Sequence, residues 1–408
     1  MKLSKTFLAV LFFLSSLNTQ GATWEFSTQF SQSSQLVLNP AVEELPKDLG
    51  PPEYLLNERL DLCLMADVYL SDAWFFQGHY LGGIAGTLAR GEGDEAFSTG
   101  LSSGSSRYRI DDLDPEPGDL GDLGGLEALS YQQNLDRFLM GYSFAWGDLT
   151  LGRQAITFGS ARFIKPTDIF TPQGLAEFPS DYRPGVDALR LEIPLGELDE
   201  LDLGWLFSPE LEDSATYARW RINRRGVDIT TTGIRNESQS ILGLGFEGSL
   251  GEWGWNQEWA LLTASEESDI RASLGFDKTQ WDILWMVEYH WNQAGESHPD
   301  NYLDTLTTHP FYQNGSVVLL GRQYVSLAGS WLAGVRSTVN GQINVNLNDG
   351  SWLSTNYWGW SINQDWDLGL QLTVAQGANP VATESGYLLQ SEFGTFPSAL
   401  HLQFNRVF

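Results

Sequence analysis

Long segments in which apolar and polar residues alternate one by one constrain the fold of this chain more than any other feature. Successive side chains of a β-strand point to opposite faces, so strict alternation indicates strands with one apolar and one polar face. The segment 55–70 places these residues on its apolar face: Leu60, Leu62, Leu64, Ala66, Val68 and Leu70. Segments 134–146, 280–292 and 366–376 alternate in the same way. The sequence therefore predicts an all-β fold.

Two further features distinguish a membrane barrel from a soluble sandwich, whose strands would also alternate. Many segments are about 10–15 residues long, which suits the roughly 9–11 tilted residues that cross a bilayer. Tryptophans gather at the ends of the apolar faces, as expected for rings that prefer the interface between lipid and water. These residues are Trp74, Trp146, Trp281, Trp291, Trp352 and Trp366. We therefore expect the apolar faces to contact lipid.

The connections between the segments also favour a barrel. Sixteen strands are predicted, at 22–32, 55–70, 73–90, 134–146, 148–158, 186–194, 200–208, 240–249, 252–264, 268–277, 280–292, 322–333, 335–347, 351–363, 366–376 and 398–408. Connections after even-numbered strands are short, whereas most after odd-numbered strands are long, including 159–185 and 209–239. Outer-membrane barrels have short periplasmic turns and long extracellular loops. The predicted fold is a single transmembrane antiparallel up-and-down β-barrel of about 16 strands (14–18), with a water-filled interior.

The N-terminal end predicts export from the cytoplasm. Lys2 and Lys5 precede the short apolar run 7–14 and small residues around Gly21, which is the layout of a secretory signal peptide. We expect residues 1–21 to be this signal peptide and residues 22–408 to form the barrel. Removing two lysines leaves 21 basic against 52 acidic residues, so the net charge becomes 21 − 52 = −31. Such an acidic chain repels nucleic acid.

The chain ends on the aromatic residue Phe408, preceded by apolar residues at alternate positions: Leu400, Leu402 and Phe404. This ending resembles the assembly signal of bacterial outer-membrane barrels. The resemblance implies that Phe404 and Phe408 form the assembly signal and that the barrel-assembly machinery is a partner. It also implies a multi-pass β-barrel in a Gram-negative outer membrane. Arg406 departs from the signal, in which this position is usually apolar.

A second stretch, LGRQAITFGSARFIKPTDIFTPQ followed by DYRPGVDALRLEIP, resembles a segment of porin-like barrels near the alginate-export group. There, a strand with Gly-Arg-Gln leads through a Trp/Phe-Gly turn and an Asn-Pro-x-Asp loop into a returning strand. Phe158 stands where Trp is common, and Lys165 stands where the pattern prefers Asn. The resemblance covers residues 151–194 and implies a porin-like barrel without indicating a substrate.

The loop 159–185 and its flanking strands supply the candidate site. Four prolines stiffen this loop, which suits a folded segment. We expect the loop to pack inside the barrel and narrow the pore, with opposed charges that set ion selectivity. The pore-lining or constriction residues would be Arg153, Arg162, Lys165, Asp168, Arg183, Arg190 and Glu192. The alternative is a structural salt-bridge network that holds the loop to the wall.

Two charged stretches leave alternatives open. The acidic stretch 111–127 fits either a solvated outer loop or a calcium site that bridges to lipopolysaccharide. The basic stretch RWRINRR, residues 219–225, falls within the predicted loop 209–239. Its arginines fit either contacts with lipopolysaccharide phosphates or pairing with the acidic loop.

Residue types that carry catalysis or bind metals show no suitable pattern. The five histidines lack metal-type spacing, and no G-x-S-x-G motif is present. Barrel hydrolases use Ser and His on adjacent strands, and His79 or His290 could serve such a role. A polar lumen residue is the favoured interpretation of both. The single cysteine, Cys63, excludes an intrachain disulfide and a thiolate metal cluster. We expect no enzyme activity, no cofactor and no metal.

Together these features predict a passive or substrate-selective channel for small hydrophilic solutes or ions. The acidic excess favours cations or neutral solutes over anions. Two alternatives remain open, namely an export pore for a secreted polysaccharide and a non-conducting structural barrel. The expected partners are outer-membrane lipid and lipopolysaccharide, and a homotrimer is an open alternative to a monomer.

Overall fold

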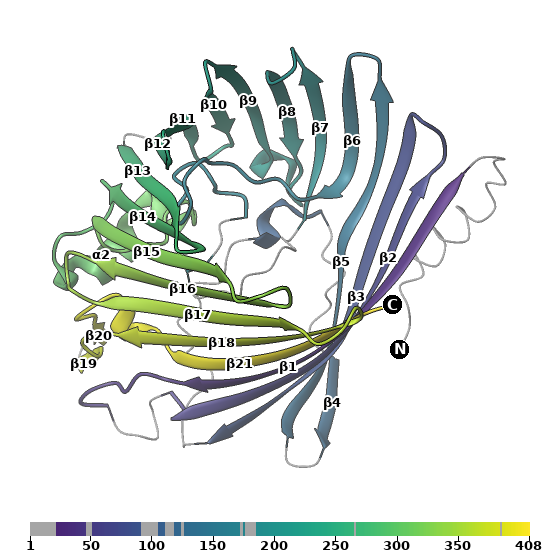
Figure 1. The fold of residues 1–408 in the computed structure, drawn as a ribbon. Coiled ribbons are helices and arrows are strands. Elements are labelled where there is room, and N and C mark those ends of the chain that lie inside the picture. The colour runs from purple at the N-terminus through teal and green to yellow at the C-terminus, as the bar shows by residue number, and fades with distance from the viewer. Residues whose placement is uncertain are drawn as a thin grey trace.

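The chain folds into a closed antiparallel β-barrel (Figure 1). The computed structural model describes residues 22–45, 51–90, 105–110, 118–123, 126–171, 174–175, 185–264, 267–383 and 386–408. Eighteen strands form the wall. They are β1 (Thr23–Leu38), β2 (Tyr54–Tyr69), β3 (Trp74–Arg90), β5 (Leu126–Phe144), β6 (Gly147–Gln154), β7 (Val186–Pro194), β8 (Glu200–Leu206), β9 (Ala215–Arg224), β10 (Val227–Arg235), β11 (Ser240–Leu250), β12 (Trp253–Ala264), β13 (Glu267–Gln280), β14 (Ile283–Asn292), β15 (Gln323–Leu332), β16 (Ser337–Asn346), β17 (Trp352–Ser361), β18 (Trp366–Gln376) and β21 (Ser398–Val407). The last strand, β21, pairs with β1 and closes the barrel.

The predicted number of sixteen strands is wrong, because the segment 209–239 contains a further hairpin. β9 and β10 pair there along their whole length. Their turn, Arg225-Gly226, has φ angles of 56° and 81°, as a tight two-residue hairpin turn requires. The arginines of β9 obscured the alternation. Trp220, 48% exposed, faces outward, whereas Arg219 and Arg221 on either side of it face the lumen.

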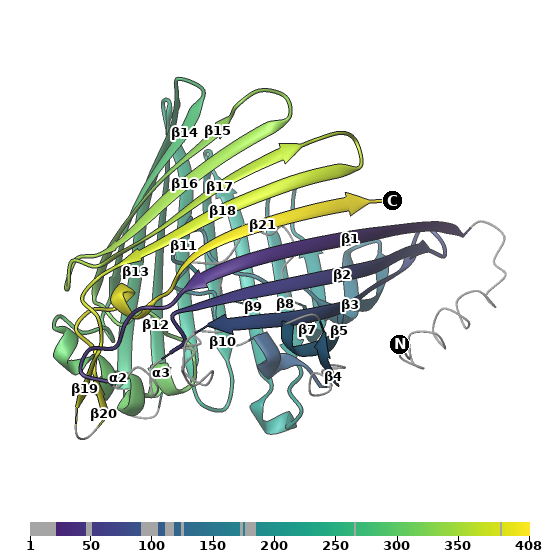
Figure 2. The same ribbon diagram turned by 90° about the horizontal axis from the view of Figure 1, so that it is seen from below.

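The tight turns lie at one rim of the barrel, here called the tight-turn rim. They are 70–73, 145–146, 195–199, 225–226, 251–252, 281–282, 333–336 and 362–365. The opposite rim, here called the loop rim, carries the described parts of the other connections: 39–45, 51–53, 105–110, 118–123, 155–171, 174–175, 207–214, 236–239, 293–322, 347–351, 377–383 and 386–397. Figure 2 shows the C-terminus at the tight-turn rim, opposite the helices of the loop rim. Because the two additional strands form a hairpin, the tight turns and the longer connections still alternate between the two rims.

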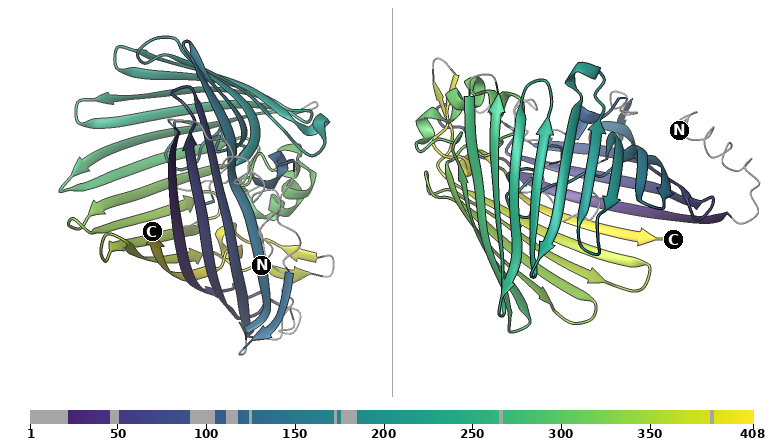
Figure 3. Two further views of the ribbon diagram at one scale, coloured as in Figure 1. Left: turned by 90° about the vertical axis from the view of Figure 1, so that its right-hand side faces the viewer. Right: turned by 90° about the horizontal axis from the view of Figure 1, so that it is seen from above.

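Short elements decorate the loop rim. They are η1 (Ser105–Tyr108), β4 (Gly118–Leu123), η2 (Leu211–Asp213), η3 (Pro299–Asn301), α2 (Tyr302–Thr308), α3 (Pro310–Gln313), the hairpin β19 (Val381–Thr383) and β20 (Gly386–Leu388), and η4 (Phe393–Thr395). β4 pairs with β5 but is not part of the closed wall, which Figure 3 shows from two further sides. Among the described residues, no helix has the length and hydropathy that a membrane crossing requires.

The outer face of the wall is apolar and exposed. Alternate residues of neighbouring strands contribute to it, including Leu242, Leu244, Trp259, Leu261, Leu274, Val287, Leu327, Leu372 and Leu400. Exposed tryptophans line the tight-turn rim, namely Trp74, Trp146, Trp253, Trp281, Trp331 and Trp360. A continuous apolar belt edged by aromatic rings is the surface that a barrel presents to lipid.

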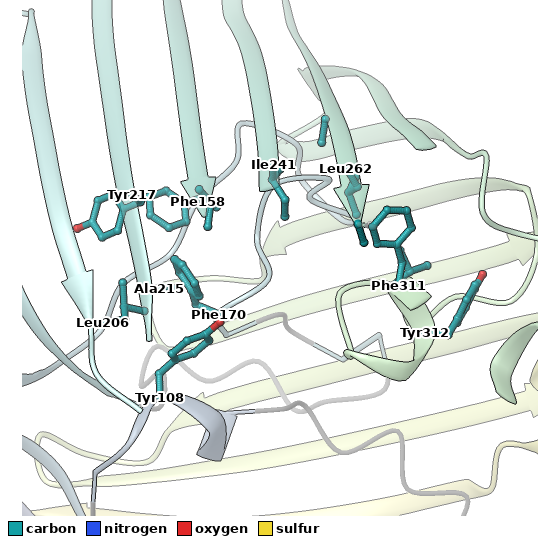
Figure 4. Close-up of a cluster of buried hydrophobic side chains, with 14 of the residues drawn as sticks. Tyr108, Phe158, Phe170, Leu206, Ala215, Tyr217, Ile241, Leu262, Phe311 and Tyr312 are labelled. Carbon is teal, nitrogen blue, oxygen red and sulfur yellow. The ribbon is translucent and has the colours of Figure 1, made fainter. Parts of the chain in front are cut away.

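Part of the barrel interior holds a hydrophobic core made from loops. Phe158 and Phe170 of the connection 155–185 pack with Tyr108 of η1 and Tyr217 of β9, and the same cluster extends to Phe311 of α3 (Figure 4). The rings of Phe158 and Tyr217 meet edge to face, with centroids 4.9 Å apart. The loops therefore fold into the barrel mouth and pack against its inner wall, because apolar side chains there escape water.

A buried carboxylate ties three loop-rim connections together. Glu392 accepts hydrogen bonds from the backbone N–H of Leu320 at 3.0 Å, from Asn346 at 2.8 Å and from the hydroxyl of Tyr324. Asp349 accepts from the backbone N–H of Glu392 at 2.8 Å. The connections 293–322, 347–351 and 377–397 thus share one polar network.

Candidate functional site

The connection 155–185 enters the lumen directly after β6, and its described residues 155–171 and 174–175 are here called the inner loop. Gly159, with a φ of 97°, turns the inner loop against β12, where a Cβ atom would lie 2.8 Å from the Glu258 carboxylate. Such a turn leaves backbone N–H groups without helix or sheet partners, and buried N–H groups need acceptors. Two glutamates of the barrel wall supply them.

Glu258 of β12 is 1% exposed and receives four hydrogen bonds from the inner loop. One carboxylate oxygen accepts from the backbone N–H groups of Ser160 and Ala161, both at 2.8 Å. The other oxygen accepts from the backbone N–H of Thr167 at 2.9 Å and from its hydroxyl at 2.6 Å. Glu258 thus holds both ends of the segment 160–167.

Glu288 of β14 holds the middle of the same segment. Its carboxylate accepts from the backbone N–H groups of Arg162 at 2.7 Å, Phe163 at 3.3 Å and Ile164 at 3.0 Å. Hydrogen bonds to a charged acceptor are stronger than neutral ones. The two glutamates therefore fix the inner loop to β12 and β14.

Further contacts anchor the inner loop across the lumen. Arg271 of β13 donates to the carbonyl of Pro166 at 3.3 Å, and Arg219 donates to that of Thr157 at 3.4 Å. Thr355 of β17 donates to the carbonyl of Leu175 at 3.2 Å. The described inner loop thus makes contacts from β9 to β17.

The one Ser–His contact on adjacent described strands belongs to this anchoring. The hydroxyl of Ser273 on β13 lies 2.8 Å from Nδ1 of His290 on β14. The same hydroxyl donates to the carbonyl of Ile164 at 2.6 Å, so its proton is engaged with the inner loop. Both side chains are buried under the loop. This arrangement positions the loop and does not present a nucleophile to the lumen.

The predicted site residues fall into different environments. Arg153 is buried and forms a two-pronged pair with Asp187, at 2.8 and 3.0 Å. Arg162, 39% exposed, pairs with Glu247 at 2.5 Å and lies 3.7 Å from Asp277. Within the inner loop, Lys165 is half-buried and Asp168 is buried. Arg183 lies outside the described residues.

Arg190 and Glu192 belong to an ion-pair network on the inner face of β7–β9. Arg190 donates to both carboxylate oxygens of Asp202, at 3.0 and 2.8 Å, and pairs with Glu192 at 2.7 Å. Arg219 also donates to Asp202, at 2.7 Å, and Arg221 donates to Glu200 at 3.0 Å. Three arginines thus face three carboxylates, so the network carries no net charge.

The same network contains a cluster of carboxylates and two arginines of the basic stretch 219–225. Glu192, Glu200 and Asp202 bring carboxylate oxygens within 4.8 Å of one another, which a metal ion could use. Arg190 and Arg219 already occupy the oxygens of Asp202, so the network is an ion-pair arrangement. For the stretch 219–225, contact with lipopolysaccharide and pairing with the acidic loop were the two open alternatives, but Arg219 and Arg221 face the lumen and pair instead with Asp202 and Glu200 of β8. The other two arginines, Arg224 and Arg225, lie at the tight-turn rim.

Sequence reasoning missed Asp202, Glu200, Glu258 and Glu288. A usable signal existed for each, because each is an acidic residue on the polar face of a predicted strand. The acidic stretch 111–127 lies largely outside the described residues.

The C-terminal residues close the barrel at the tight-turn rim. Leu400, Leu402 and Phe404 pair with the outward residues Leu372, Leu370 and Leu368 of β18. Phe408 exchanges backbone hydrogen bonds with Thr28 of β1, the shorter at 2.8 Å. Arg406 places its guanidinium 5.1 Å from the ring centre of Trp366 and 4.2 Å from that of Phe408. Its charge is therefore stacked on aromatic rings at the barrel rim.

Comparisons with known proteins identify the fold. No family model matches the chain, and no curated protein matches it. Solved structures with the same architecture include OccK7 (OpdD) of Pseudomonas aeruginosa, with a TM-score of 0.55 and 9% identity, covering 95% of this chain and 99% of that one. OccAB2 of Acinetobacter baumannii has a TM-score of 0.55 and 8% identity, covering 94% and 98%. OccK9 (OpdG) of Pseudomonas aeruginosa has a TM-score of 0.55 and 10% identity, covering 94% and 98%.

These neighbours are outer-membrane porins. The expected porin-like resemblance is therefore confirmed at the level of the fold. The closed wall and its exposed apolar belt agree with the expected location in an outer membrane. The chain thus has the closed antiparallel β-barrel fold of these solved structures.

Proposed function

We propose that the chain is an outer-membrane channel through which small hydrophilic solutes and ions diffuse. The observation that carries this proposal is an eighteen-strand wall with a polar inner face and an inner loop fixed inside the lumen. Barrels of this size enclose a water-filled interior. Because the inner loop is fixed at many points, it narrows the lumen. It does not swing across the lumen and close it.

The channel prefers cations weakly. The whole chain carries a formal charge of −29, and the ion-pair network on β7–β9 is balanced. At the exposed Arg162, the two carboxylates Glu247 and Asp277 outnumber the single guanidinium. A pore lined by an excess of one sign concentrates the opposite ion.

The biogenesis of the channel follows from its two ends. Residues 1–21 act as a signal peptide, which N-terminal sequencing of the mature protein would test. Phe404 and Phe408 act as the signal for the barrel-assembly machinery. The apolar belt contacts outer-membrane lipid, and the loop rim contacts lipopolysaccharide. The channel itself is a monomer or a homotrimer.

Planar-bilayer recording in KCl tests the channel proposal. Stable open steps, with a reversal potential under a salt gradient that indicates cation preference, support the diffusion channel. Silence from folded protein favours a non-conducting structural barrel. An export pore for an acidic polysaccharide would instead show anion preference, because its lumen must attract the polymer.

A further inference from the structure

The lipid-facing side of the barrel has a hollow next to the tight turn 251–252. Four neighbouring strands, β11 to β14, line it with large apolar side chains: Leu250, Trp253, Trp255, Phe276 and Val287. Phe276 is the direct cross-strand partner of both Trp255 and Val287. Leu250 and Trp253 pair in the same way beside the turn. We call this hollow, which has a volume of about 400 Å³, the rim hollow.

The rim hollow is part of the apolar belt and is open to the outside. Leu250 is 70% exposed, and Trp253 and Phe276 are 51% and 41% exposed. The ring of Trp255 lies over Gly248 of β11, where a Cβ atom would come within 3.2–3.3 Å of three ring atoms. The absent side chain at Gly248 gives this ring room to lie against the wall. Exposed apolar side chains around a hollow favour an apolar occupant, and a membrane supplies acyl chains.

A charged pair borders the rim hollow at the tight turn. Nζ of Lys278 lies 5.2 Å from the ring centre of Trp253, a lining residue, and 3.0 Å from the carboxylate of Glu252. Lys278 is two residues from Phe276 on β13, so it also faces lipid. Its direct partner on β14 is Trp285, which is 40% exposed. A lysine between tryptophans belongs at the level of the lipid head groups, because a charge deeper in the hydrocarbon is costly.

Both charges remain accessible to a ligand. The side chain of Glu252 is 83% exposed, and that of Lys278 is 23% exposed. An ion pair with such an exposed partner is weak, so each charge can be shared with a bound group. The pair therefore places a positive and a negative group side by side at the edge of an apolar hollow.

This arrangement matches the chemistry of a zwitterionic phospholipid. Such a lipid combines a phosphate, a primary ammonium a few bonds away and long acyl chains. The Lys278 ammonium would donate to the phosphate, and the Glu252 carboxylate would accept hydrogen bonds from the ammonium of the lipid. Trp253 belongs to both the hollow and the charged pair, so an acyl chain can extend from the head group into the hollow. An anionic head group without an amine would be attracted by Lys278 but repelled by Glu252.

We propose that the rim hollow and the pair Lys278–Glu252 form a binding site for a phospholipid whose head group carries a phosphate and a primary ammonium. The site goes beyond the proposed channel function and requires only that the apolar belt lies in lipid. It is on the outer surface, so a bound lipid does not enter the lumen. A bound lipid covers apolar side chains of β11–β14 and stabilises the folded barrel.

Native mass spectrometry of the folded, delipidated barrel in a neutral detergent tests the head-group preference. Phosphatidylethanolamine should bind more tightly than phosphatidylglycerol, which lacks the amine. It should also bind more tightly than phosphatidylcholine, whose quaternary ammonium cannot donate hydrogen bonds. All three lipids carry the same acyl chains.

Variants of the charged pair assign the preference to these residues. Lys278→Met should weaken binding of phosphatidylethanolamine by about tenfold, which corresponds to the loss of one charge-assisted contact. Glu252→Gln should remove the preference for phosphatidylethanolamine over phosphatidylglycerol, because the repulsion of the anionic head group is lost. Glu197→Gln makes the same change at the exposed tight turn 195–199 and should leave lipid binding unchanged. Val287→Trp fills the hollow and should weaken binding of all three lipids.

The outcomes separate the lipid site from the channel. Equal binding of the three lipids to the wild type, or wild-type affinity in Lys278→Met, overturns the site. Oligomers that Val287→Trp separates into monomers also overturn it, since the hollow would then be a contact between copies of the chain. Normal KCl current without lipid preference overturns the site alone, and lipid preference without current overturns the channel alone. If a variant fails to fold, as judged by heat-dependent migration on a gel, the comparison of lipids on the wild type still decides.

Discussion

Replacing Glu258 by Gln should loosen the inner loop without opening the barrel. The substitution keeps the size of the side chain and one oxygen acceptor, but the new amide NH2 group cannot accept hydrogen bonds. One pair of donors therefore loses its acceptor. This pair is either the backbone N–H groups of Ser160 and Ala161, or the backbone N–H and the hydroxyl of Thr167. The strand pairing of β12 with β11 and β13 does not involve the side chain.

The expected size of the effect follows from the number of lost hydrogen bonds. A buried donor left without an acceptor costs about 1–3 kcal/mol. Two such donors destabilise the docked loop by about 2–6 kcal/mol. Since 1.4 kcal/mol is a tenfold change, the undocked fraction should rise by a factor of about 30 or more.

Single-channel recording detects this change directly. Wild-type channels should show steady open levels, whereas Glu258→Gln channels should switch often between conductance sublevels as the loop leaves and rejoins the wall. Thr167→Val removes only the hydroxyl donor and should give an intermediate switching rate. Glu252→Gln makes the same change at an exposed tight turn and should behave as the wild type. Folded Glu258→Gln channels with steady wild-type currents would refute the anchoring role of Glu258.

Three further predictions concern the loop rim, the C-terminus and the corrected strands. Burial raises the pKa of the Glu392 carboxyl to about 7, so its protonated form is favoured when the loops are docked. The free energy of loop docking should therefore become less favourable by on the order of 3 kcal/mol as the pH rises from about 4.5 to about 7. It should stay constant at higher pH. Hydrogen exchange of residues 386–397 against pH should show this, and Glu392→Gln should abolish it; a flat wild-type profile would contradict it. Deleting Phe408 removes the backbone contacts with Thr28 and should reduce the amount of folded barrel in outer membranes, and normal insertion would disprove the assembly role. A cysteine at Trp220 should react with lipid-soluble but not with water-soluble thiol reagents, and the reverse result would place β9 outside the membrane wall.

Most of the wall could be predicted from the sequence, because lipid on one side and water on the other enforce alternation. The hairpin of β9 and β10 was the exception, since Arg219 and Arg221 made β9 resemble part of a charged loop. Their charges become acceptable in the barrel because Asp202 and Glu200 on the neighbouring strand neutralise them. That neighbour relation depends on strand register, which a single sequence does not display.

The candidate site was harder to predict than the wall. Glu258 and Glu288 are visible in the sequence as acids among alternating residues, but their partners are backbone N–H groups that carry no residue signature. The pairing of Arg190 with Glu192 could be expected from their spacing, whereas the pairing with Asp202 required the register of β7 and β8. Arg406 broke the expected C-terminal pattern, and its stacking on Trp366 and Phe408 explains how it is accommodated.

The central claim is that a water-filled passage runs through the barrel beside the fixed inner loop. Single-channel conductance in KCl, measured with neutral polymers of increasing size in the bath, tests it most directly. Small polymers should enter the pore and lower the conductance, while polymers above a sharp size limit should have no effect. Release of the inner loop by Glu258→Gln should make the dependence of the conductance on polymer size more gradual. Folded wild-type protein that gives no conductance steps, or a conductance insensitive to polymers of every size, would contradict the account.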